Sequence, residues 1–258
     1  MKKRRKITPA LLCALKRRGV PIAMVTAYDA EGGRLADEAG IDIILVGDTG
    51  AEMMQGHSST VPATIDGQLM MTRAVSGHVS RALIVGDLPF GAYEFSDEDA
   101  VRSAIRLVKE GGADVVKLEG PRPSQVRAIT GAGVAVMGHL GLTPQSQTAL
   151  GGRKVQGRTA AAALQLVAQA RELEAAGCFA LVFEAVPEPV AEQITRGLAI
   201  PTIGIGAGRG CDGQVLVYHD LLGLLDWSPR FAKTYSDLRG QIAAALNQYV
   251  ADVRLGAG

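Results

Sequence analysis

The sequence has few cysteines, almost no excess of charge of either sign and no long apolar run. Its 258 residues include 27 Lys and Arg against 26 Asp and Glu, a balance that argues against a broad basic surface for nucleic acid. The three cysteines, Cys13, Cys178 and Cys211, follow no disulfide or zinc spacing. They indicate reduced thiols and a cytoplasmic protein.

No apolar stretch is long enough to cross a bilayer, so we expect no membrane-spanning segment. Residues 2–6 are all Lys or Arg, but the apolar region of a secretory signal does not follow them. We interpret this cluster as a solvated tail, with contact to nucleic acid as the lesser alternative. Because no linker or low-complexity segment divides the chain, we expect residues 1–258 to form a single domain.

Short apolar runs rich in β-branched residues alternate with amphipathic helical segments. Strands are expected at residues 21–28, 43–46, 83–86, 114–118, 134–137, 180–183, 200–205 and 214–218. Helices are expected at residues 8–18, 30–39, 64–78, from Ser96 onward, and at 124–130, 159–176, 189–198 and 235–250. This alternation predicts an α/β fold, a (β/α)8 barrel with an N-terminal helix; an open doubly wound sheet is the alternative.

A glycine-rich stretch contains Gly204, Gly206 and Gly208. Such a pattern can indicate dinucleotide binding, but that motif belongs after the first strand of its fold. Here it comes after the seventh expected strand, where barrels often bind anions.

A polar residue follows each of the expected strands two to six. In a (β/α)8 barrel the residues after the strands converge at the active-site face. Three of them, Asp48, Asp87 and Glu119, would repel one another without protonation, a basic partner or a cation. Because oxygen-only ligands suit a hard divalent ion, we expect Mg²⁺ rather than Zn²⁺. The alternative is that each acid caps the helix that follows it.

Three further polar residues belong to the same strand ends. Lys117 lies two residues before Glu119 on the same side of its strand, where it could neutralise the carboxylates or bind an anion. His139 has no partner at metal-ligand spacing, so we interpret it as a hydrogen-bonding group. Glu184 leaves a very apolar strand, surroundings that suit a carboxylate for proton transfer, and capping is again the alternative.

Seven motifs between about residues 20 and 220 carry a resemblance to a known family. They occupy residues 46–49, 55–57, 87–90, 116–120, 138–146, 154–158 and 204–208. The block Gly-His-Leu-Gly-Leu-Thr-Pro-Gln-Ser at residues 138–146 is the most specific of them. Together they resemble ketopantoate hydroxymethyltransferase.

The resemblance implies a (β/α)8 barrel of the phosphoenolpyruvate/pyruvate superfamily. Such an enzyme transfers a hydroxymethyl group from methylene-tetrahydrofolate to 2-oxoisovalerate (3-methyl-2-oxobutanoate) through a Mg²⁺-stabilised enolate. The product, ketopantoate (2-dehydropantoate), is an intermediate of pantothenate and coenzyme A biosynthesis. A homo-oligomer is also implied, since family members are commonly decamers. The alternatives are a Mg²⁺-dependent lyase or mutase acting on a phosphoenolpyruvate-like 2-oxo acid, and a catalytically silent keto-acid-binding paralogue.

The family's site residues can be carried onto this sequence position by position. By resemblance, Mg²⁺ is held by Asp48, Asp87 and Glu119, and Glu184 accepts the proton. The keto acid is contacted, again by resemblance, by Asp48, Thr49, Asp87 and Lys117, and we expect His139 to bind it as well.

The sequence departs from the family in the loop after the second expected strand. Thr49 stands where many members have Ser, which keeps the hydroxyl and adds a methyl group. Glu52 adds a charge that we did not expect near the substrate.

Overall fold

The computed structural model describes residues 5–256. Lys2, Lys3 and Arg4 of the basic cluster therefore lie outside the described residues. The chain divides into two compact units, Met1–Val215 and Leu216–Gly258. The expectation of a single domain over residues 1–258 stays a prediction.

Eight parallel strands form a closed barrel in sequence order, which confirms the predicted (β/α)8 fold. The strands are β1 (Ile22–Thr26), β2 (Ile43–Val46), β3 (Leu83–Asp87), β4 (Val115–Glu119), β5 (Val136–Gly141), β6 (Cys178–Glu184), β7 (Thr202–Ile205) and β8 (Gly213–Leu216). Every residue of β2, β3 and β4 is buried, as expected for parallel strands that are covered by helices on the outside.

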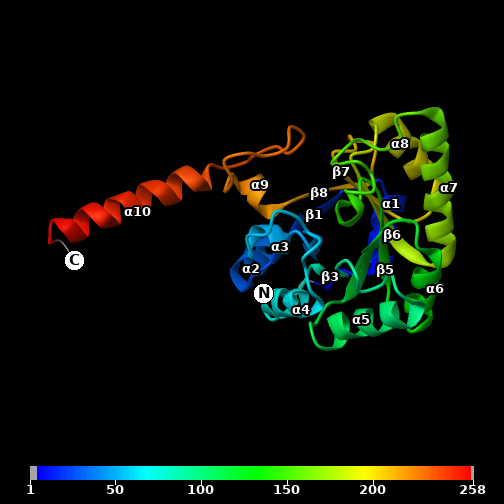
Figure 1. The fold of residues 1–258 in the computed structure, drawn as a ribbon, viewed down its shortest axis with the longest axis horizontal. Coiled ribbons are helices and arrows are strands. Elements are labelled where there is room, and N and C mark those ends of the chain that lie inside the picture. Colours follow the sequence, from blue (N-terminus) through cyan, green and yellow to red (C-terminus); the bar gives the residue numbers. More distant parts are fainter. Residues whose placement is uncertain (1–4, 257–258) are drawn as a thin grey trace. The chain divides into compact units, whose positions relative to one another are not determined.

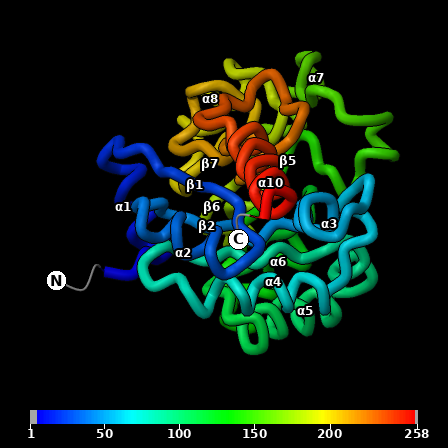
Figure 2. The backbone as a smooth tube through the Cα atoms, turned by 90° about the vertical axis from the view of Figure 1, so that its left-hand side faces the viewer, coloured from blue at the N-terminus to red at the C-terminus, as the bar shows by residue number. Residues whose placement is uncertain are grey.

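Helices connect the strands, and α4 to α7 follow one another around the outside of the barrel (Figures 1 and 2). The first unit contains α1 (Pro9–Arg17), α2 (Ala30–Ala39), α3 (Gly50–Met53), α4 (Ile65–Ser76), α5 (Asp97–Lys109), α6 (Pro123–Gly131), the 3-10 turn η1 (Pro144–Ser146), α7 (Ala160–Ala176) and α8 (Glu188–Gly197). The second unit contains α9 (Tyr218–Leu222) and α10 (Leu238–Arg254). No helix among residues 5–256 is long and apolar enough to cross a membrane.

The predicted N-terminal helix is present, and its sequence signals explain its ends. The Thr8 hydroxyl accepts a hydrogen bond from the Leu11 N–H, and Pro9 occupies the first helical position. Two other helices end at a glycine. Gly40 follows the last residue of α2 and Gly177 that of α7, with φ angles of 90° and 110°, a conformation that favours glycine.

Two apolar layers stabilise the barrel. The inner layer fills its interior and includes Met24, Val85 and Met137. The outer layer lies between the strands and the helices and includes Leu173 and Phe183. Because successive strand residues point to opposite sides, the polar residues at the strand ends can face the barrel mouth while their neighbours pack outward.

The parallel register aligns polar residues of neighbouring strands. Asp87 lies opposite Lys117, and Glu119 lies opposite His139. Glu184 lies opposite Gly141. The register alone therefore brings the residues predicted from the strand ends to one end of the barrel.

The structure differs from the sequence prediction mainly at element ends. We expected the fifth strand at residues 134–137, but β5 runs on to Gly141 because Gly138 and the residues after it pair with β6. The helices α3 and α9 were not predicted, since four or five residues are too few to show a helical period. The last helix begins at Leu238 rather than residue 235, because Asp237 caps it by accepting the Gly240 N–H.

Asp37 on α2 connects that helix to the segment before β3. Its carboxylate accepts hydrogen bonds from the backbone N–H groups of Ser80 (2.9 Å), Arg81 (3.1 Å) and Ala82 (2.6 Å). Burial alone would raise the pKa of Asp37, but these N–H groups outweigh burial and hold the pKa below its usual value. The folded state therefore gains stability from the ionised carboxylate.

We expect Asp37→Asn to lower the free energy of unfolding by about 1.5–3 kcal/mol at pH 7, because hydrogen bonds to a charged acceptor are lost. Since the folded pKa of Asp37 is lowered, its contribution is present above the unfolded pKa and is lost as pH falls through the folded value. Urea unfolding at pH 7 and near pH 3 measures both effects. The exposed neighbour Glu38→Gln is the control, and an unchanged midpoint in Asp37→Asn at pH 7 would contradict the prediction.

Candidate active site

The acids at the strand ends do not cap the helices that follow them. The N-cap residues of α3, α5, α6 and α8 are Thr49, Ser96, Arg122 and Pro187. Only Ser96 among these makes a side-chain capping bond. The capping interpretation of the acids is therefore wrong, and their carboxylates have other partners.

Three buried carboxylates and one buried amine form the centre of the site. Asp48, Asp87 and Glu119 are each at most 4% exposed, and Lys117 is 3% exposed. The Lys117 Nζ lies 2.8 Å from Asp87 Oδ1 and 4.0 Å from Glu119 Oε1. The Asp48 backbone N–H donates to Asp87 Oδ2 at 3.1 Å. The structure thus brings together the three acids and the lysine that the sequence predicted, which we call the carboxylate cluster.

The carboxylate cluster contains three acids and one amine. Burial and mutual repulsion make it costly for all three acids to be ionised. Burial, followed by the charges of Asp87 and Glu119, raises the pKa of Asp48 well above its usual value. Burial also raises the pKa of Asp87, against the opposing effect of Lys117. For Lys117, burial would lower the pKa, but the carboxylates outweigh it, so the amine stays protonated. One ammonium group faces three carboxylates, an arrangement that favours an additional cation.

His139 bridges the cluster to Glu184. Its Nδ1 lies 3.3 Å from Glu119 Oε1, and its Nε2 lies 3.4 Å from Glu184 Oε2. Burial and Lys117 would lower the pKa of His139, but Glu119 and Glu184 raise it to about 9. The Glu184 side chain is 19% exposed, whereas that of His139 is 5% exposed. Glu184 is therefore the acid of the site that a ligand can reach.

The backbone around Glu184 is held in an unusual conformation. Ala185 has a φ angle of 48°, the only positive φ of a non-glycine residue among residues 5–256. A Cβ on Gly141, whose φ is 94°, would lie 2.3 Å from the Glu184 carbonyl oxygen. The Ala185 carbonyl accepts the N–H of Gln156, which ties the long β5–α7 loop to the end of β6. Strain of this kind is typical of functional sites.

The loop after β2 carries two further polar residues that the sequence singled out. The Thr49 hydroxyl lies 2.7 Å from the hydroxyl of Tyr28, two residues beyond β1. Glu52 forms an ion pair of 2.6 Å with Arg153 of the β5–α7 loop. The charge of Glu52 is therefore paired with Arg153.

Sequence reasoning missed two residues of the site, Gln145 and Tyr93. Both are buried, and both hydrogen-bond to members of the carboxylate cluster. Gln145 lies in η1, four residues beyond the end of β5, so the search for polar residues directly after strands did not reach it. The only available signal was its place in the motif at residues 138–146.

The donor set fits a hard divalent cation, because it offers buried carboxylate oxygens and a shortage of positive charge. As the side chains are placed, no group of three His, Cys, Asp or Glu within residues 5–256 is arranged to hold a metal ion. Lys117 and the Gln145 amide take up carboxylate oxygens instead. The prediction that Asp48, Asp87 and Glu119 hold the ion stays a prediction.

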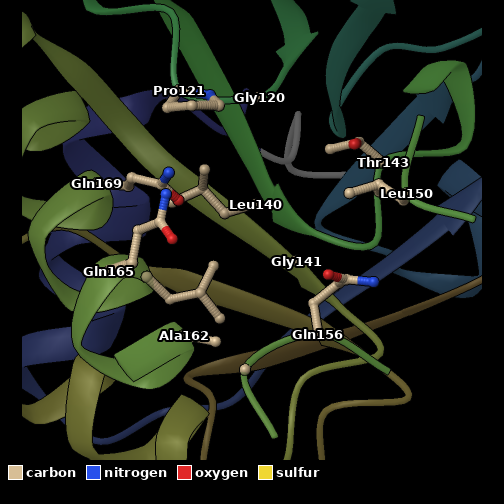
Figure 3. Close-up of a pocket in the computed structure, with 12 residues that line it drawn as sticks. Gly120, Pro121, Leu140, Gly141, Thr143, Leu150, Gln156, Ala162, Gln165 and Gln169 are labelled. Atoms are coloured by element: carbon tan, nitrogen blue, oxygen red, sulfur yellow. The ribbon is translucent and has the colours of Figure 1, made fainter. Parts of the chain in front are cut away.

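A cavity of about 200 Å³ lies between the ends of β4 and β5 and helix α7. Figure 3 shows the side chains of Gln165 and Gln169 from α7 near Leu140 of β5. Its lining contains amide and aliphatic groups but no charged side chain. No member of the carboxylate cluster lines this cavity, which suits an uncharged group.

The chain is similar to known proteins along nearly its whole length. The sequence pattern of the ketopantoate hydroxymethyltransferase family matches residues 6–257. The 3-methyl-2-oxobutanoate hydroxymethyltransferase of Oleidesulfovibrio alaskensis is 56% identical over 238 residues, 91% of this chain and 82% of that protein. The enzyme of the same name from Moorella thermoacetica is 54% identical and covers 99% of this chain and 96% of that protein.

Solved structures of more distant proteins share the fold. A 2,3-dimethylmalate lyase of the PEP mutase/isocitrate lyase superfamily aligns with a TM-score of 0.62 at 15% identity, over 97% of this chain and 89% of that chain. Phosphonopyruvate hydrolase, in complex with oxalate and Mg²⁺, aligns with a TM-score of 0.63 at 14% identity, over 97% and 88%. At this level of identity the likeness concerns the barrel alone.

Proposed function

The chain belongs to the ketopantoate hydroxymethyltransferase family, and on that basis we propose that it transfers a hydroxymethyl group from methylene-tetrahydrofolate to 2-oxoisovalerate, giving ketopantoate. One observation in the structure supports this activity most directly. The partly exposed carboxylate of Glu184 lies beside a buried cluster of three acids and a lysine, joined to it through His139. A base that a substrate can reach thus lies near carboxylates that could bind a cation and a lysine that could bind the carboxylate of the keto acid.

Glu184 is the proposed base. It would remove the proton from the carbon next to the carbonyl of the keto acid, which is the carbon that gains the hydroxymethyl group. His139 Nε2, at 3.4 Å from Glu184 Oε2, would hold the carboxylate in place. Lys117 and the Thr49 hydroxyl would bind the keto acid, and the Tyr28 hydroxyl, 2.7 Å from that of Thr49, would hold the Thr49 side chain in place.

We propose that Asp48, Asp87 and Glu119 hold a Mg²⁺ ion. The ion, when bound, supplies Lewis-acid stabilisation of the negative charge that develops on the keto oxygen. Their burial and the raised pKa values of Asp48 and Asp87 support this assignment, because a divalent cation relieves the repulsion among them.

The activity is tested by incubating the purified protein with 2-oxoisovalerate, methylene-tetrahydrofolate and Mg²⁺. Ketopantoate should form in amounts that match the tetrahydrofolate released. Turnover of the keto acid without the folate would indicate a lyase or mutase instead. Binding of the keto acid with no turnover under either condition would indicate a silent paralogue.

Removal of divalent cations should abolish activity. EDTA followed by gel filtration should leave a folded but inactive protein, and added Mg²⁺ or Mn²⁺ should restore turnover, since both suit oxygen ligands. Circular dichroism before and after chelation is the control for folding. Full activity in the metal-free protein would refute the role of the cation.

Thr49→Val should weaken binding of the keto acid more than it slows turnover. Valine keeps the shape of threonine and removes the hydroxyl, so one hydrogen bond to a charged ligand is lost, worth about 1.5–3 kcal/mol. KM for 2-oxoisovalerate should rise roughly tenfold to hundredfold. Thr148→Val, an exposed threonine of the β5–α7 loop, is the matched control. An unchanged KM in Thr49→Val would remove Thr49 from the substrate site.

We also propose that the protein is a cytoplasmic homo-oligomer. The three cysteines are all free thiols in the structure, which supports a reducing compartment. Along α10, Ile242, Leu246, Tyr249 and Val253 recur at the three-to-four-residue spacing of a helix that packs on a partner. Light scattering coupled to gel filtration measures the subunit number, and a monomer would refute this proposal.

A further inference from the structure

Gln145 contacts three strand ends of the barrel at once. Its side-chain Nε2 donates to Asp48 Oδ2 at 2.9 Å and to the Leu88 carbonyl at 3.0 Å. Its backbone N–H donates to Glu119 Oε2 at 3.0 Å. Asp48 follows β2, Leu88 follows β3 and Glu119 ends β4. A single residue therefore joins two carboxylates that stand on strands that do not pair with each other.

Tyr93 fixes the direction of the Gln145 amide. The Tyr93 hydroxyl oxygen lies 3.2 Å from the Glu119 backbone nitrogen and 2.5 Å from Gln145 Oε1. Because the Glu119 N–H can only donate, the hydroxyl accepts there and gives its own proton to Oε1. With Oε1 facing Tyr93, the two protons of Nε2 face Asp48 Oδ2 and the Leu88 carbonyl, which accept them.

The residues of this network are almost wholly shielded from water. Tyr93 is 1% exposed and Gln145 is 5% exposed. Water therefore cannot replace a bond that is removed, and a partner left behind stays unpaired. The network holds Asp48 and Glu119 in one arrangement, although the register of the sheet fixes only their backbones.

We propose that Gln145, held by Tyr93, is a positioning residue: by binding one oxygen of Asp48 and one oxygen of Glu119, it orients both carboxylates and so strengthens their binding of a divalent cation. This inference rests on the proposed function, in which these two acids and Asp87 hold Mg²⁺. Gln145 acts on the cation through the carboxylates, in the way that hydrogen-bond partners of metal ligands commonly tune affinity. Tyr93 acts one step further out, through the orientation of the amide.

The test is a calorimetric titration of the metal-free protein with Mg²⁺, in the absence of substrates. Gln145→Leu removes the side-chain amide but keeps the backbone N–H that binds Glu119. Tyr93→Phe removes only the hydroxyl. Gln147→Leu makes the same change two residues away, at a side chain that contacts Arg153 and none of the carboxylates, and serves as the matched control.

We expect the Mg²⁺ dissociation constant to rise about 10–100-fold in Gln145→Leu, to rise less in Tyr93→Phe and to stay unchanged in Gln147→Leu. Activity assays give a second readout. Turnover by Gln145→Leu should be low at limiting Mg²⁺ and should recover as Mg²⁺ is raised to saturation, because the defect lies in affinity for the cation. A merely structural defect would not be corrected in this way.

Several outcomes would overturn the inference. If folded Gln145→Leu and Tyr93→Phe bind Mg²⁺ as tightly as the unmodified protein, Gln145 does not position the acids, while the proposed function stands. If the unmodified protein binds no Mg²⁺, the proposed metal site fails and the inference fails with it. If circular dichroism shows that Gln145→Leu does not fold, Tyr93→Phe decides, since it removes a single oxygen atom.

Discussion

Lys117→Met should lower the free energy of unfolding by about 3–5 kcal/mol at pH 7, as is usual when one partner of a buried ion pair is removed. Methionine keeps much of the length of the lysine side chain but carries no charge. Lys117 Nζ lies 2.8 Å from Asp87 Oδ1, and the three acids of the carboxylate cluster are all buried. Its loss would leave the three carboxylates with only the His139 ring, 3.3 Å from Glu119, as a basic partner.

The pH dependence distinguishes this charge effect from a packing defect. Burial raises the pKa values of Asp48 and Asp87 even with Lys117 present, and its removal should raise them further. A carboxyl group whose folded pKa exceeds its unfolded pKa destabilises the folded protein once the pH rises above the unfolded pKa. Protonation of the group removes this destabilisation as the pH falls. The stability deficit of Lys117→Met should therefore shrink between pH 7 and pH 5.

Urea unfolding of the metal-free protein at the two pH values measures the deficit. Lys109→Met, at an exposed lysine on α5, is the control and should change the midpoint little. A deficit in Lys117→Met that does not depend on pH would point to lost packing. No deficit at all would mean that the carboxylates are already neutral at pH 7.

Much of the site could be predicted from sequence because the barrel imposes a simple rule. Each buried strand ends at the same face, so the first polar residue after an apolar run belongs to that face. This rule found Asp48, Asp87 and Glu119, and the alternation of side chains added Lys117. The structure then showed that the register of β4 and β5 also places His139 opposite Glu119.

The rule fails for residues that lie several positions beyond a strand and reach the carboxylate cluster from a loop. Gln145 reaches the cluster from a 3-10 turn, four residues beyond the end of β5. Tyr93 reaches it from the loop before α5, six residues beyond Asp87. Neither position is set by strand period or by local capping, since both depend on which loops meet above the barrel. Sequence patterns of a single chain do not contain that information.

Glu184→Gln should abolish most proton removal from the keto acid while leaving its binding intact. Glutamine keeps the shape of glutamate but is not a base. Glu184 is the most accessible acid of the site, and its only charged neighbour recorded among residues 5–256 is His139, at 3.4 Å. The variant should therefore fold, and the carboxylate cluster should keep its own contacts.

Hydrogen exchange in heavy water measures this step without the folate. With 2-oxoisovalerate and Mg²⁺ alone, the unmodified protein should exchange the hydrogen on the carbon next to the carbonyl, and nuclear magnetic resonance follows the loss of that signal. Since a positioned general base contributes about 10²–10⁴-fold, exchange by Glu184→Gln should slow by a factor in that range. Slow residual exchange is expected, because polarisation of the carbonyl by the cation remains.

The matched control is Glu188→Gln, an exposed glutamate four residues further along that contacts the Arg209 N–H and no member of the cluster. It should exchange at the unmodified rate. If Glu184→Gln also exchanged at that rate while binding the keto acid normally, Glu184 would not be the base. His139 would then be the next candidate, because its Nε2 lies 3.4 Å from Glu184 Oε2.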